Sequence, residues 1–397
     1  MVNVAILGFG TVGSGVAEVL TTNGGLIDQR VTDQVRLKYI LDVRDFTGSP
    51  YQDCFVKDFS VIENDPEVDI VVETIGGATV ALDFTTRALK AGKSVVSSNK
   101  ELVATHGYDL LQLAREKGVS YLFEASVGGG IPILRPLMSC LAANELSEVT
   151  GILNGTTNYI LTRMIKAGLT FDQALKEAQD NGYAEKDPTA DVDGHDACRK
   201  ICILAALAFG EHVYPQQVST QGIRSISLAD VAYADSCGYK IKLLGRARRL
   251  EEGKVCAFVA PHLVPAQNPL SGVEDVFNAI AVRGNAIGDA MFYGRGAGKL
   301  PTASAVVADV MDLARGVQTP RPLAWQAGGD DVVAPVSELR SDWCVRLAGE
   351  VPEEWQPVYW PEAPEGQYAL LLADMTRGEM EEALEGLSVL SAYRMLG

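Results

Sequence analysis

The sequence is poor in several kinds of residue, and each shortage excludes a class of protein. Only four histidines occur among its 397 residues and no HExxH motif is present, which argues against a zinc enzyme. The seven cysteines are odd in number and form no CxxC pair, so the sequence favours a reducing compartment. Cys198 and Cys202 could suggest a metal pair, but no further cluster of soft ligands exists, and we interpret them as core residues.

Basic residues and long apolar runs are also scarce. Lysine and arginine total 34 against 51 acidic residues, which gives a net charge of −17. This charge repels phosphate backbones and anionic lipid, so we expect neither nucleic acid nor a membrane as a partner. The longest wholly apolar run, residues 201–209, is too short to span a bilayer. Because the chain starts directly with a strand-like run, we expect no signal peptide and predict a cytoplasmic protein.

The sequence does contain ample material for folded domains, with 47% hydrophobic and 21% charged residues. Alternating strand-like and helix-like segments over residues 1–124 predict a doubly wound parallel sheet of the α/β class. From about residue 145 the pattern becomes α+β. We predict four parts: a dinucleotide-binding domain at 1–130, to which helix 303–316 returns; a substrate-binding and dimerisation domain at 131–302; a linker at 317–337; and a small module at 338–397.

A glycine-rich motif follows the first predicted strand and precedes a predicted helix. It reads Gly8-Phe9-Gly10-Thr11-Val12-Gly13, a GxGxxG pattern in the context that a Rossmann dinucleotide site requires. The first glycine allows the tight turn, the second lets a pyrophosphate approach the backbone, and the third lets helix and strand pack closely. We predict that these six residues bind a dinucleotide; the alternative is a glycine-rich turn without a ligand.

The second predicted strand ends with both of the residue types that distinguish the two nicotinamide cofactors. Asp42 suits the ribose 2′-hydroxyl of NAD, whereas Arg44 suits the 2′-phosphate of NADP. Lys57 could add to a phosphate site or simply lie in solvent. The sequence therefore predicts NAD or NADP without choosing between them.

Later strand ends supply further candidates for the cofactor site. Thr74 and Gly76 follow the strand VDIVVE, and Ser98 and Lys100 follow the next strand. Ligands bind at the carboxyl ends of parallel strands, so Lys100 is a candidate for function; the alternative is a surface lysine at the start of a helix. Gly298 closes a second glycine-rich turn, GRGAG, and we include it among the candidates.

The stretch from Gly182 to Gly210 combines polar and apolar residues on one helical face. At helical spacing this face carries Asp193, Asp196 and Lys200, followed by isoleucine and leucines. Asp191 or Asp193 could cap the helix, and Gly210 could end it. A buried lysine beside carboxylates is energetically costly unless it forms an ion pair or serves in proton transfer or substrate binding. We therefore predict either proton transfer and substrate binding or a structural ion pair.

A third glycine-rich segment, Gly128 to Gly130, lies between Ser126 and Pro132. Three glycines free the backbone to present carbonyl or amide groups, which suits a ligand or a hard cation. The alternative is a tight bend between domains.

Together these motifs resemble homoserine dehydrogenase. The resemblance covers about residues 1–316 and is carried by GFGTVG at 8–13, SSNK at 97–100, EASVGGGIP at 124–132, GILNGTTNYI at 151–160, GYAEKDPTADVDGHDACRK at 182–200 and GRGAGKLPTASAV at 294–306. The long middle motifs are specific, because a generic Rossmann protein would not carry them all.

The resemblance implies the reversible NAD(P)-dependent interconversion of L-homoserine and L-aspartate 4-semialdehyde, a step toward threonine, methionine and isoleucine. It also implies that Lys200 is the catalytic acid/base and that Lys100 is its companion near the substrate and the nicotinamide. Making an aldehyde from an alcohol needs a hydride acceptor and a base within reach of the hydroxyl, which agrees with these roles.

The same resemblance assigns binding residues. Glu185 and Asp196 would position the substrate, the glutamate by holding its amino group, and Gly182 and Asp191 complete the candidate substrate site. The family's sodium site is matched by the Glu124 side chain and the backbone of Val127, Gly129 and Ile131. The family is generally a homodimer through the substrate domain.

The last sixty residues depart from the family. Many bacterial members end in an ACT domain that binds a regulatory amino acid, and residues 338–397 resemble a shortened, ACT-like version, which is scarcely long enough for a full βαββαβ unit.

Two other functions remain as alternatives. Another amino-acid semialdehyde dehydrogenase of the acylating kind would need a cysteine nucleophile, and neither Cys140 nor Cys198 has a histidine partner in any motif. A non-catalytic NAD(P)-sensing regulatory protein would have no use for a buried Lys200 beside Asp196.

Overall fold

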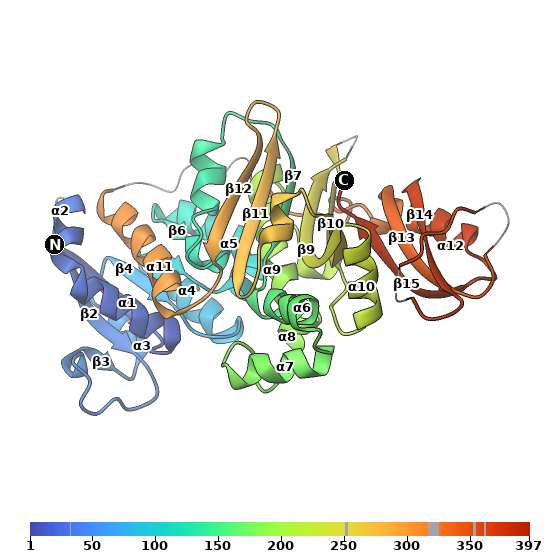
Figure 1. Ribbon diagram of the computed structural model, residues 1–397. Helices are drawn as coiled ribbons and strands as arrows, with labels where there is room; N and C mark the ends of the chain where they lie inside the picture. The colour runs from blue at the N-terminus through green and yellow to red at the C-terminus, as the bar shows by residue number, and fades with distance from the viewer. Residues whose placement is uncertain (32, 251–252, 317–324, 352–354, 361–362) are drawn as a thin grey trace.

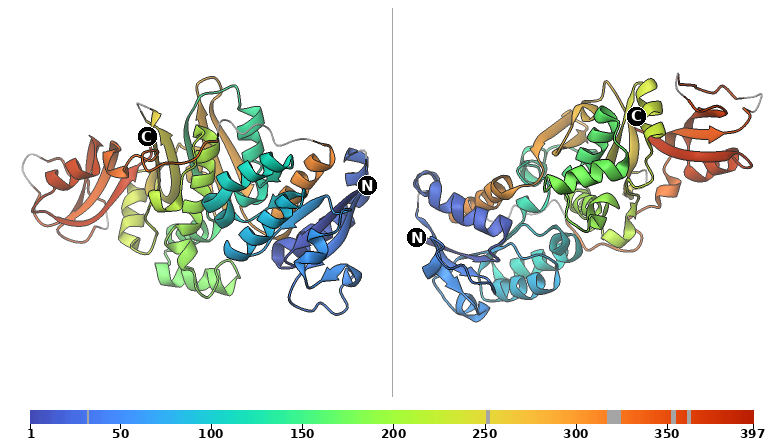
Figure 2. Two further views of the ribbon diagram at one scale, coloured as in Figure 1. Left: turned by 180° about the vertical axis from the view of Figure 1, so that it is seen from behind. Right: turned by 60° about the horizontal axis from the view of Figure 1, so that its bottom comes forward.

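The computed structural model describes residues 1–31, 33–250, 253–316, 325–351, 355–360 and 363–397. The chain forms three parts in a row, with the N-terminal part at one end and the C-terminal module at the other (Figure 1). The views from behind and from below show the same order (Figure 2). None of the helices in the described segments has both the length and the apolar character that a membrane-spanning segment needs.

The N-terminal part is built on a parallel sheet in the order β3-β2-β1-β4-β5-β6, which confirms the predicted doubly wound α/β class. The central strand β1 is buried from Val4 to Leu7, as expected for an apolar run covered by helices on both faces. The strands are β1 (Val2–Leu7), β2 (Val35–Leu41), β3 (Phe55–Val56), β4 (Ile70–Glu73), β5 (Ser94–Ser97) and β6 (Tyr121–Leu122). The helices are α1 (Thr11–Thr22), α2 (Gly24–Val31), α3 (Phe59–Glu63), α4 (Thr79–Lys90) and α5 (Lys100–Lys117).

One helix from much later in the chain completes this part. Helix α11 (Lys299–Ala314) lies beside α1, and its Ala303 and Val306 join the apolar cluster formed with Val16 (Figure 1). A Cβ atom at Gly15 of α1 would lie 2.7 Å from the carbonyl oxygen of Lys299, so only glycine allows this close approach. The chain therefore leaves the dinucleotide-binding part and returns to it. The exact domain boundaries stay a prediction.

The middle part and the C-terminal module share one mixed sheet in the order β12-β11-β7-β9-β10-β15-β13-β14, with β8 pairing β10. The strands of the middle part are β7 (Leu146–Ile152), β8 (Ser219–Thr220), β9 (Tyr239–Arg249), β10 (Val255–Pro265), β11 (Phe277–Gly284) and β12 (Gly288–Arg295). Its helices are α6 (Gly155–Ala167), α7 (Phe171–Asp180), α8 (Thr189–Val192), α9 (His195–Phe209) and α10 (Leu228–Ser236).

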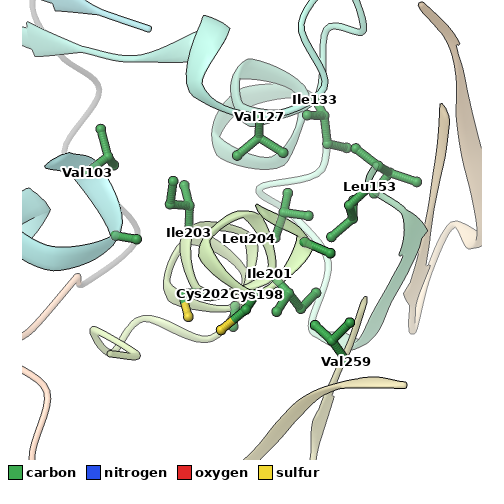
Figure 3. Packing of buried hydrophobic residues seen from close by; sticks show 14 of the residues in the cluster. Val103, Val127, Ile133, Leu153, Cys198, Ile201, Cys202, Ile203, Leu204 and Val259 are labelled. Carbon is green, nitrogen blue, oxygen red and sulfur yellow. The ribbon is translucent and has the colours of Figure 1, made fainter. Parts of the chain in front are cut away.

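Helix α9 lies in the centre of the core. Looking down its axis, Leu204 points toward Val127, Ile203 lies on the side of Val103, and Ile201 lies on the side of Val259 (Figure 3). Cys198 and Cys202 are both buried on this helix, which agrees with their interpretation as core residues. Because α9 is enclosed on several sides, polar residues near its N-terminus are held rigidly.

The C-terminal module contains β13 (Ser341–Ala348), β14 (Gln367–Met375), α12 (Arg377–Ala383) and β15 (Ser388–Met395). Strand β15 runs parallel to β10, with His262 opposite Arg394 and Leu263 opposite Met395, so the module extends the main sheet. The predicted linker falls partly on residues 317–324, which lie outside the described residues. Further along it, the Trp325 indole donates to His212, whose ring also contacts the carbonyl oxygen of Ala104 in α5.

Candidate active site

Asp196 lies at the centre of a buried polar cluster where the two larger parts meet. Its Oδ2 accepts hydrogen bonds from Lys200 Nζ at 2.7 Å and from Asn154 Nδ2 at 2.9 Å. Its Oδ1 forms an ion pair with Lys100 Nζ at 2.5 Å. Lys200 comes from the middle part and Lys100 from the dinucleotide-binding part, so one carboxylate joins two candidate lysines across the boundary.

The start of α9 differs from the sequence prediction. The helix begins at His195 after Gly194, which has a left-handed φ of 85°, so neither Asp191 nor Asp193 caps it. Asp193 lies outside the helix and pairs with Arg224 at 2.5 Å. A side chain at Gly194 would also crowd β8 and β10, which explains the left-handed turn. The predicted end of the helix at Gly210 is confirmed by its left-handed C-cap.

Lys100 is placed by the N-terminus of α5. Asn99 caps this helix, because its Oδ1 accepts from the N–H groups of Glu101 and Leu102, each at 3.1 Å. Lys100 is the first helical residue and is separated from the end of β5 by Ser98 and Asn99. The Lys100 side chain is 39% exposed to solvent, whereas the Lys200 side chain is only 9% exposed. Lys100 thus lies at the mouth of the cluster and Lys200 inside it.

Asn154 was not among the predicted site residues, although it lies in a motif that carried the family resemblance. Its Nδ2 donates to Asp191 at 2.7 Å as well as to Asp196, and its Oδ1 caps α6 by accepting from Thr157 N–H. The polar run 154–158 is typical of a turn, but in the structure Gly155 already begins the helix. An asparagine before a helix is a capping signal, and that signal could have drawn attention to this position.

Burial and nearby charge shift the pKa values of the two lysines in opposite directions. Burial lowers the pKa of Lys200, and the charge of Asp196 only partly offsets this. Burial alone would also lower the pKa of Lys100, but the charge of Asp196 outweighs it and raises that pKa. Burial would raise the pKa of Asp196, but the charges of the two lysines hold it well below its usual range. Lys200 is therefore the amine that loses its proton more readily.

The loop from Gly182 to Pro188 borders this cluster. The hydroxyl of Thr156 in α6 donates to the carbonyl oxygen of Tyr183 at 2.7 Å, which ties the loop to the start of α6. Gly182 has a left-handed φ of 73° and Glu185 is exposed. Burial, followed by the charge of Asp196, raises the pKa of Asp191. The loop thus presents the exposed carboxylate of Glu185, and the partly buried Asp191 follows in α8.

The glycine-rich loop after β1 has the shape that a pyrophosphate needs. Gly8 has a left-handed φ of 90°, and a Cβ atom at Gly13 would lie 1.9 Å from the carbonyl oxygen of Gly8. At Gly10 a Cβ atom would meet nothing within 4 Å, and no side chain caps α1 there. Thr11 and Val12 open the helix, so uncapped N–H groups at its N-terminus remain for an anion. The backbone geometry fits a dinucleotide.

At the end of β2 the carboxylate of Asp42 is fully engaged. It accepts from Phe9 N–H at 2.7 Å, from Arg44 N–H at 2.9 Å, and from the Arg44 guanidinium at 3.0 and 2.9 Å. The Arg44 hydrogen bonds hold the pKa of Asp42 well below its usual range. The Arg44 side chain remains 59% exposed, and Lys57 Nζ donates to the carbonyl oxygen of the same residue. The exposed group at the end of β2 is therefore the Arg44 guanidinium and not a free carboxylate. We refer to this edge of the cofactor site as its rim.

The remaining cofactor candidates lie on neighbouring loops. Thr74 Oγ1 lies 2.9 Å from the carbonyl oxygens of both Leu7 and Gly8, so it braces the glycine-rich loop. A Cβ atom at Gly76 would meet nothing within 4 Å, and Ser98 N–H donates to the carbonyl oxygen of Glu73. Gly298 lies at the N-terminus of α11, away from the β4 and β5 loops in the sequence but next to α1 in space.

The candidate sodium residues lie on the loop after β6, but the Glu124 carboxylate already has other partners. It accepts from Ile133 N–H at 2.7 Å, Leu134 N–H at 3.0 Å and Arg135 N–H at 2.7 Å. Burial raises the pKa of Glu124 despite these bonds. These three N–H donors do not suit a cation, so the Glu124 carboxylate is poorly placed to act as a sodium ligand. The backbone of Val127, Gly129 and Ile131 stays a prediction for that site. The described residues contain no group of three or more histidine, cysteine, aspartate or glutamate side chains suited to a metal.

The glycines of this loop also serve packing. A Cβ atom at Gly129 would lie 2.5 Å from the carbonyl oxygen of Gly296, and Gly130 N–H donates to the carbonyl oxygen of Arg295. The loop therefore binds the second glycine-rich turn at the point where the chain returns toward α11. This contact fits the bend between domains that the sequence left open as an alternative.

Comparison with known proteins identifies the family. The model described as "Homoserine dehydrogenase, NAD binding domain" matches residues 8–124, and the model described as "Homoserine dehydrogenase" matches residues 132–311. The chain belongs to the homoserine dehydrogenase family. It is therefore an NAD(P)-dependent oxidoreductase that acts on the CH–OH group of L-homoserine, and the regulatory-protein alternative is not favoured.

Relatives and solved structures agree with this family. The homoserine dehydrogenases of Pseudomonas aeruginosa and Bacillus subtilis are 41% and 42% identical, over 87% and 80% of this chain and 81% and 74% of their own. The crystal structure of a homoserine dehydrogenase from Thiobacillus denitrificans has a TM-score of 0.89 at 36% identity and covers 100% of this chain and 98% of its own. A hyperthermophilic archaeal homoserine dehydrogenase in complex with NADPH has a TM-score of 0.68 at 28% identity, covering 81% of this chain and 99% of its own.

Proposed function

We propose that Lys200 is the acid/base that exchanges the proton of the substrate hydroxyl. The observation that supports this most is the single carboxylate of Asp196 between Lys200 and Lys100, with the pKa of Lys200 lowered overall and that of Lys100 raised overall. In the oxidation of L-homoserine, neutral Lys200 accepts the hydroxyl proton. In the reduction of L-aspartate 4-semialdehyde, protonated Lys200 returns it to the carbonyl oxygen.

Lys100 and Asp196 have complementary roles in this proposal. Lys100 keeps its proton because the charge of Asp196 raises its pKa, so its positive charge can stabilise the oxygen that becomes negative in the transition state. Asp196 orients both amines. The nicotinamide cofactor supplies hydride acceptance or donation when it is bound.

Substrate recognition is assigned to the loop beside the cluster. The substrate carries an ammonium group, which needs carboxylates, and Glu185 and Asp191 lie on this loop or directly after it. The left-handed turn at Gly182 and the hydrogen bond from Thr156 to Tyr183 set the path of the loop. Asn154 belongs to the same site, because it holds Asp191 and Asp196 together.

For the cofactor, we propose NADP in preference to NAD. The Asp42 carboxylate is engaged by Arg44 and Phe9 and cannot readily accept from a ribose hydroxyl, whereas the Arg44 guanidinium is exposed and suits a phosphate. The archaeal relative in complex with NADPH is consistent with this choice.

Three finer expectations also stand as proposals. A sodium ion would bind the carbonyl oxygens of residues 127, 129 and 131, without the Glu124 carboxylate. A homodimer would form through the middle part, where the edge strand β12 exposes Met291 and Tyr293. A cytoplasmic location and a role in threonine, methionine and isoleucine biosynthesis are also proposed, and family membership supports them.

The C-terminal module is proposed to be a reduced ACT-like unit. Its strand order β15-β13-β14, with α12 before β15, matches a βαββαβ unit that lacks the first helix and the second strand. An isolated bridge from Val358 to Ala369 lies where that missing strand would pair. Binding of an effector is not part of the proposal, because β15 is also hydrogen-bonded to β10.

The decisive experiment follows the nicotinamide absorbance of the purified protein with L-homoserine and each oxidised cofactor. We expect reduction of NADP+ with L-homoserine and a loss of about 10³-fold in turnover for Lys200→Met, with unchanged affinity for NADP+. Equal losses of turnover and nucleotide affinity would contradict an acid/base role for Lys200. Circular dichroism of the variant controls for misfolding.

A further inference from the structure

Glu73, the last residue of β4, carries a buried carboxylate that none of the steps above uses. Its side chain has 0% exposure. Its Oε1 accepts from Ile75 N–H at 2.7 Å and its Oε2 accepts from Ser97 Oγ–H at 2.5 Å. Among the described residues, no lysine, arginine or histidine forms an ion pair with it. A buried carboxylate without a cationic partner is costly, so its retention here needs an explanation.

The hydrogen bonds of Glu73 continue directly to Lys100. Ser97 Oγ accepts from Asn99 N–H at 3.0 Å, and Asn99 Nδ2 donates to the carbonyl oxygen of Ile75 at 3.0 Å. A closed ring therefore runs from Glu73 through Ser97, Asn99 and Ile75 back to Glu73. Asn99 is also the cap of α5, and Lys100 is the next residue. The ring thus holds the helix end from which Lys100 reaches Asp196.

A carboxylate suits this ring better than an amide of the same size. Because it only accepts, it forces the Ser97 hydroxyl proton to point toward it and leaves a lone pair of Ser97 for Asn99 N–H. Hydrogen bonds to a charged acceptor are also the stronger ones. The negative charge lies beneath the N-terminus of α5, where the helix dipole favours it.

We propose that Glu73 is a positioning residue which, through Ser97 and Asn99, fixes the first turn of α5 so that Lys100 Nζ meets Asp196 across the domain boundary. This proposal rests on the proposed role of Lys100. Burial raises the pKa of Glu73 to about 7, which is consistent with a charge held against its solvation preference. Tyr121 of β6 faces the same carboxylate, and burial followed by the charge of Glu73 raises its pKa.

The main test compares Glu73→Gln with the wild-type enzyme. The glutamine oxygen can still accept from Ile75 N–H, so the cofactor loop stays in place and NADP+ affinity is expected to be unchanged. Its amide donates toward Ser97 and reverses that bond, so the helix start shifts. A misplacement of about 1 Å at a catalytic group lowers turnover by about 10²-fold, and we expect a loss of that order.

A second variant tests the same ring from its other side. Ser97→Ala keeps the carboxylate but removes the branch of the ring that runs through Ser97, leaving only the path through Ile75, and we expect a similar loss of turnover. The double variant should be no worse than either single variant, because both changes break one path. Tyr121→Phe is the matched control, since it removes a hydroxyl that approaches Glu73 and Ser97 but leaves the four hydrogen bonds of the ring in place, and it should keep full turnover.

Thermal melting separates positioning from simple support of the fold. Because the pKa of Glu73 in the folded protein lies above its ordinary value of 4.5, the wild-type carboxylate weakens the fold as pH rises from 4.5 through about 7. Glu73→Gln removes that effect, so above neutral pH it should melt at the same or a higher temperature than the wild-type protein. Lower turnover together with undiminished stability is the expected signature.

Three results would overturn the proposal. Glu73→Gln could keep full turnover while Lys100→Met is impaired, which would leave Glu73 without a role. Glu73→Gln could instead lose NADP+ affinity with unchanged turnover, which would make it a support of the cofactor loop. Full turnover of Lys100→Met would overturn the proposed role of Lys100, and the Glu73 proposal with it.

Discussion

The side chains of Asp42 and Asp196 are equally buried, each 6% exposed, but the basic side chains that they bind differ in exposure. Arg44, the partner of Asp42, lies at the rim of the cofactor site with 59% of its side chain exposed. Asp196 has 6% of its side chain exposed and joins two lysines from different parts of the chain. Arg44 lowers the pKa of Asp42, but its own guanidinium faces solvent, so this pair is suited to recognising an incoming charge. In the buried cluster each charge shifts the pKa of the next, which is what acid/base chemistry requires.

The largest effect is expected when the buried cluster loses its carboxylate. Asp196→Asn leaves two lysines without their shared counter-ion, and breaking such a buried pair costs about 3 to 5 kcal/mol of unfolding free energy. Turnover should fall by at least about 10²-fold, because both amines lose their orientation. Asp193→Asn, which alters an exposed aspartate three residues away, is the matched control for denaturant unfolding and turnover assays.

The stability loss of Asp196→Asn should also depend on pH. The pKa of Asp196 is lowered in the folded protein, so its stabilising effect is present above the ordinary aspartate pKa of 3.8 and is lost as pH falls through the folded value. The difference between the variant and the wild-type protein should therefore be full at neutral pH and shrink in acid. A difference that grows on acidification would contradict the proposed charge pairing.

A second prediction concerns how one lysine tunes the other. The positive charge of Lys100 lowers the pKa of Lys200, so Lys100→Met should raise it. The rate of L-homoserine oxidation rises as Lys200 loses its proton, and the rising limb of the pH–rate profile should move to higher pH in this variant. Turnover should also fall. An unchanged profile with lower turnover would restrict Lys100 to orienting the substrate.

At the rim, the expected effect is on cofactor choice. Arg44→Gln removes the exposed cation, and the NADP+ dissociation constant should rise about tenfold, the lower end for a hydrogen bond to a charged group. Binding of NAD+ should change little, since it lacks the 2′-phosphate. Fluorescence titration with both cofactors measures this, with Arg36→Gln as a control for a distant arginine paired with Asp28. Equal losses for both cofactors would count against phosphate recognition.

The smallest effect is expected for the exposed pair next to the cluster. Arg224 binds Asp193 at 2.5 Å, but both side chains are partly solvated, at 47% and 33% exposure. Arg224→Gln should therefore cost no more than about 0.5 kcal/mol of stability and leave turnover unchanged. A loss comparable to that of Asp196→Asn would show that proximity to α9, rather than burial, decides what an ion pair does.

The sequence predicted those parts of the fold and site that local patterns determine. The alternation over residues 1–124 and the GxGxxG context predicted the parallel sheet, and the structure confirms it. The spacing of Asp196 and Lys200 predicted their contact, because residues four apart on a helix are neighbours. The contact between Lys100 and Asp196 is different, since it depends on how two parts of the chain pack, and no local pattern reports that.

Three details escaped the sequence for identifiable physical reasons. Asp193 seemed to share a face with Asp196, but the left-handed Gly194 starts the helix afresh and directs Asp193 to Arg224. Asp42 and Arg44 were read as rival cofactor signals, whereas they bind each other. Glu73 was read as the end of an apolar strand, because the ring that it joins is closed by residues from another strand and loop.

The parallel pairing of β15 with β10 limits how this protein can be shortened. A gene trimmed at residue 337 would uncover backbone donors and acceptors along His262 and Leu263, next to apolar surface that Tyr393 now covers. An unpaired strand edge of this kind can form hydrogen bonds with other molecules, so the truncated protein would tend to aggregate. A useful truncation would therefore need either a substitute strand that pairs with β10 or charged residues on β10 that disfavour pairing with other molecules.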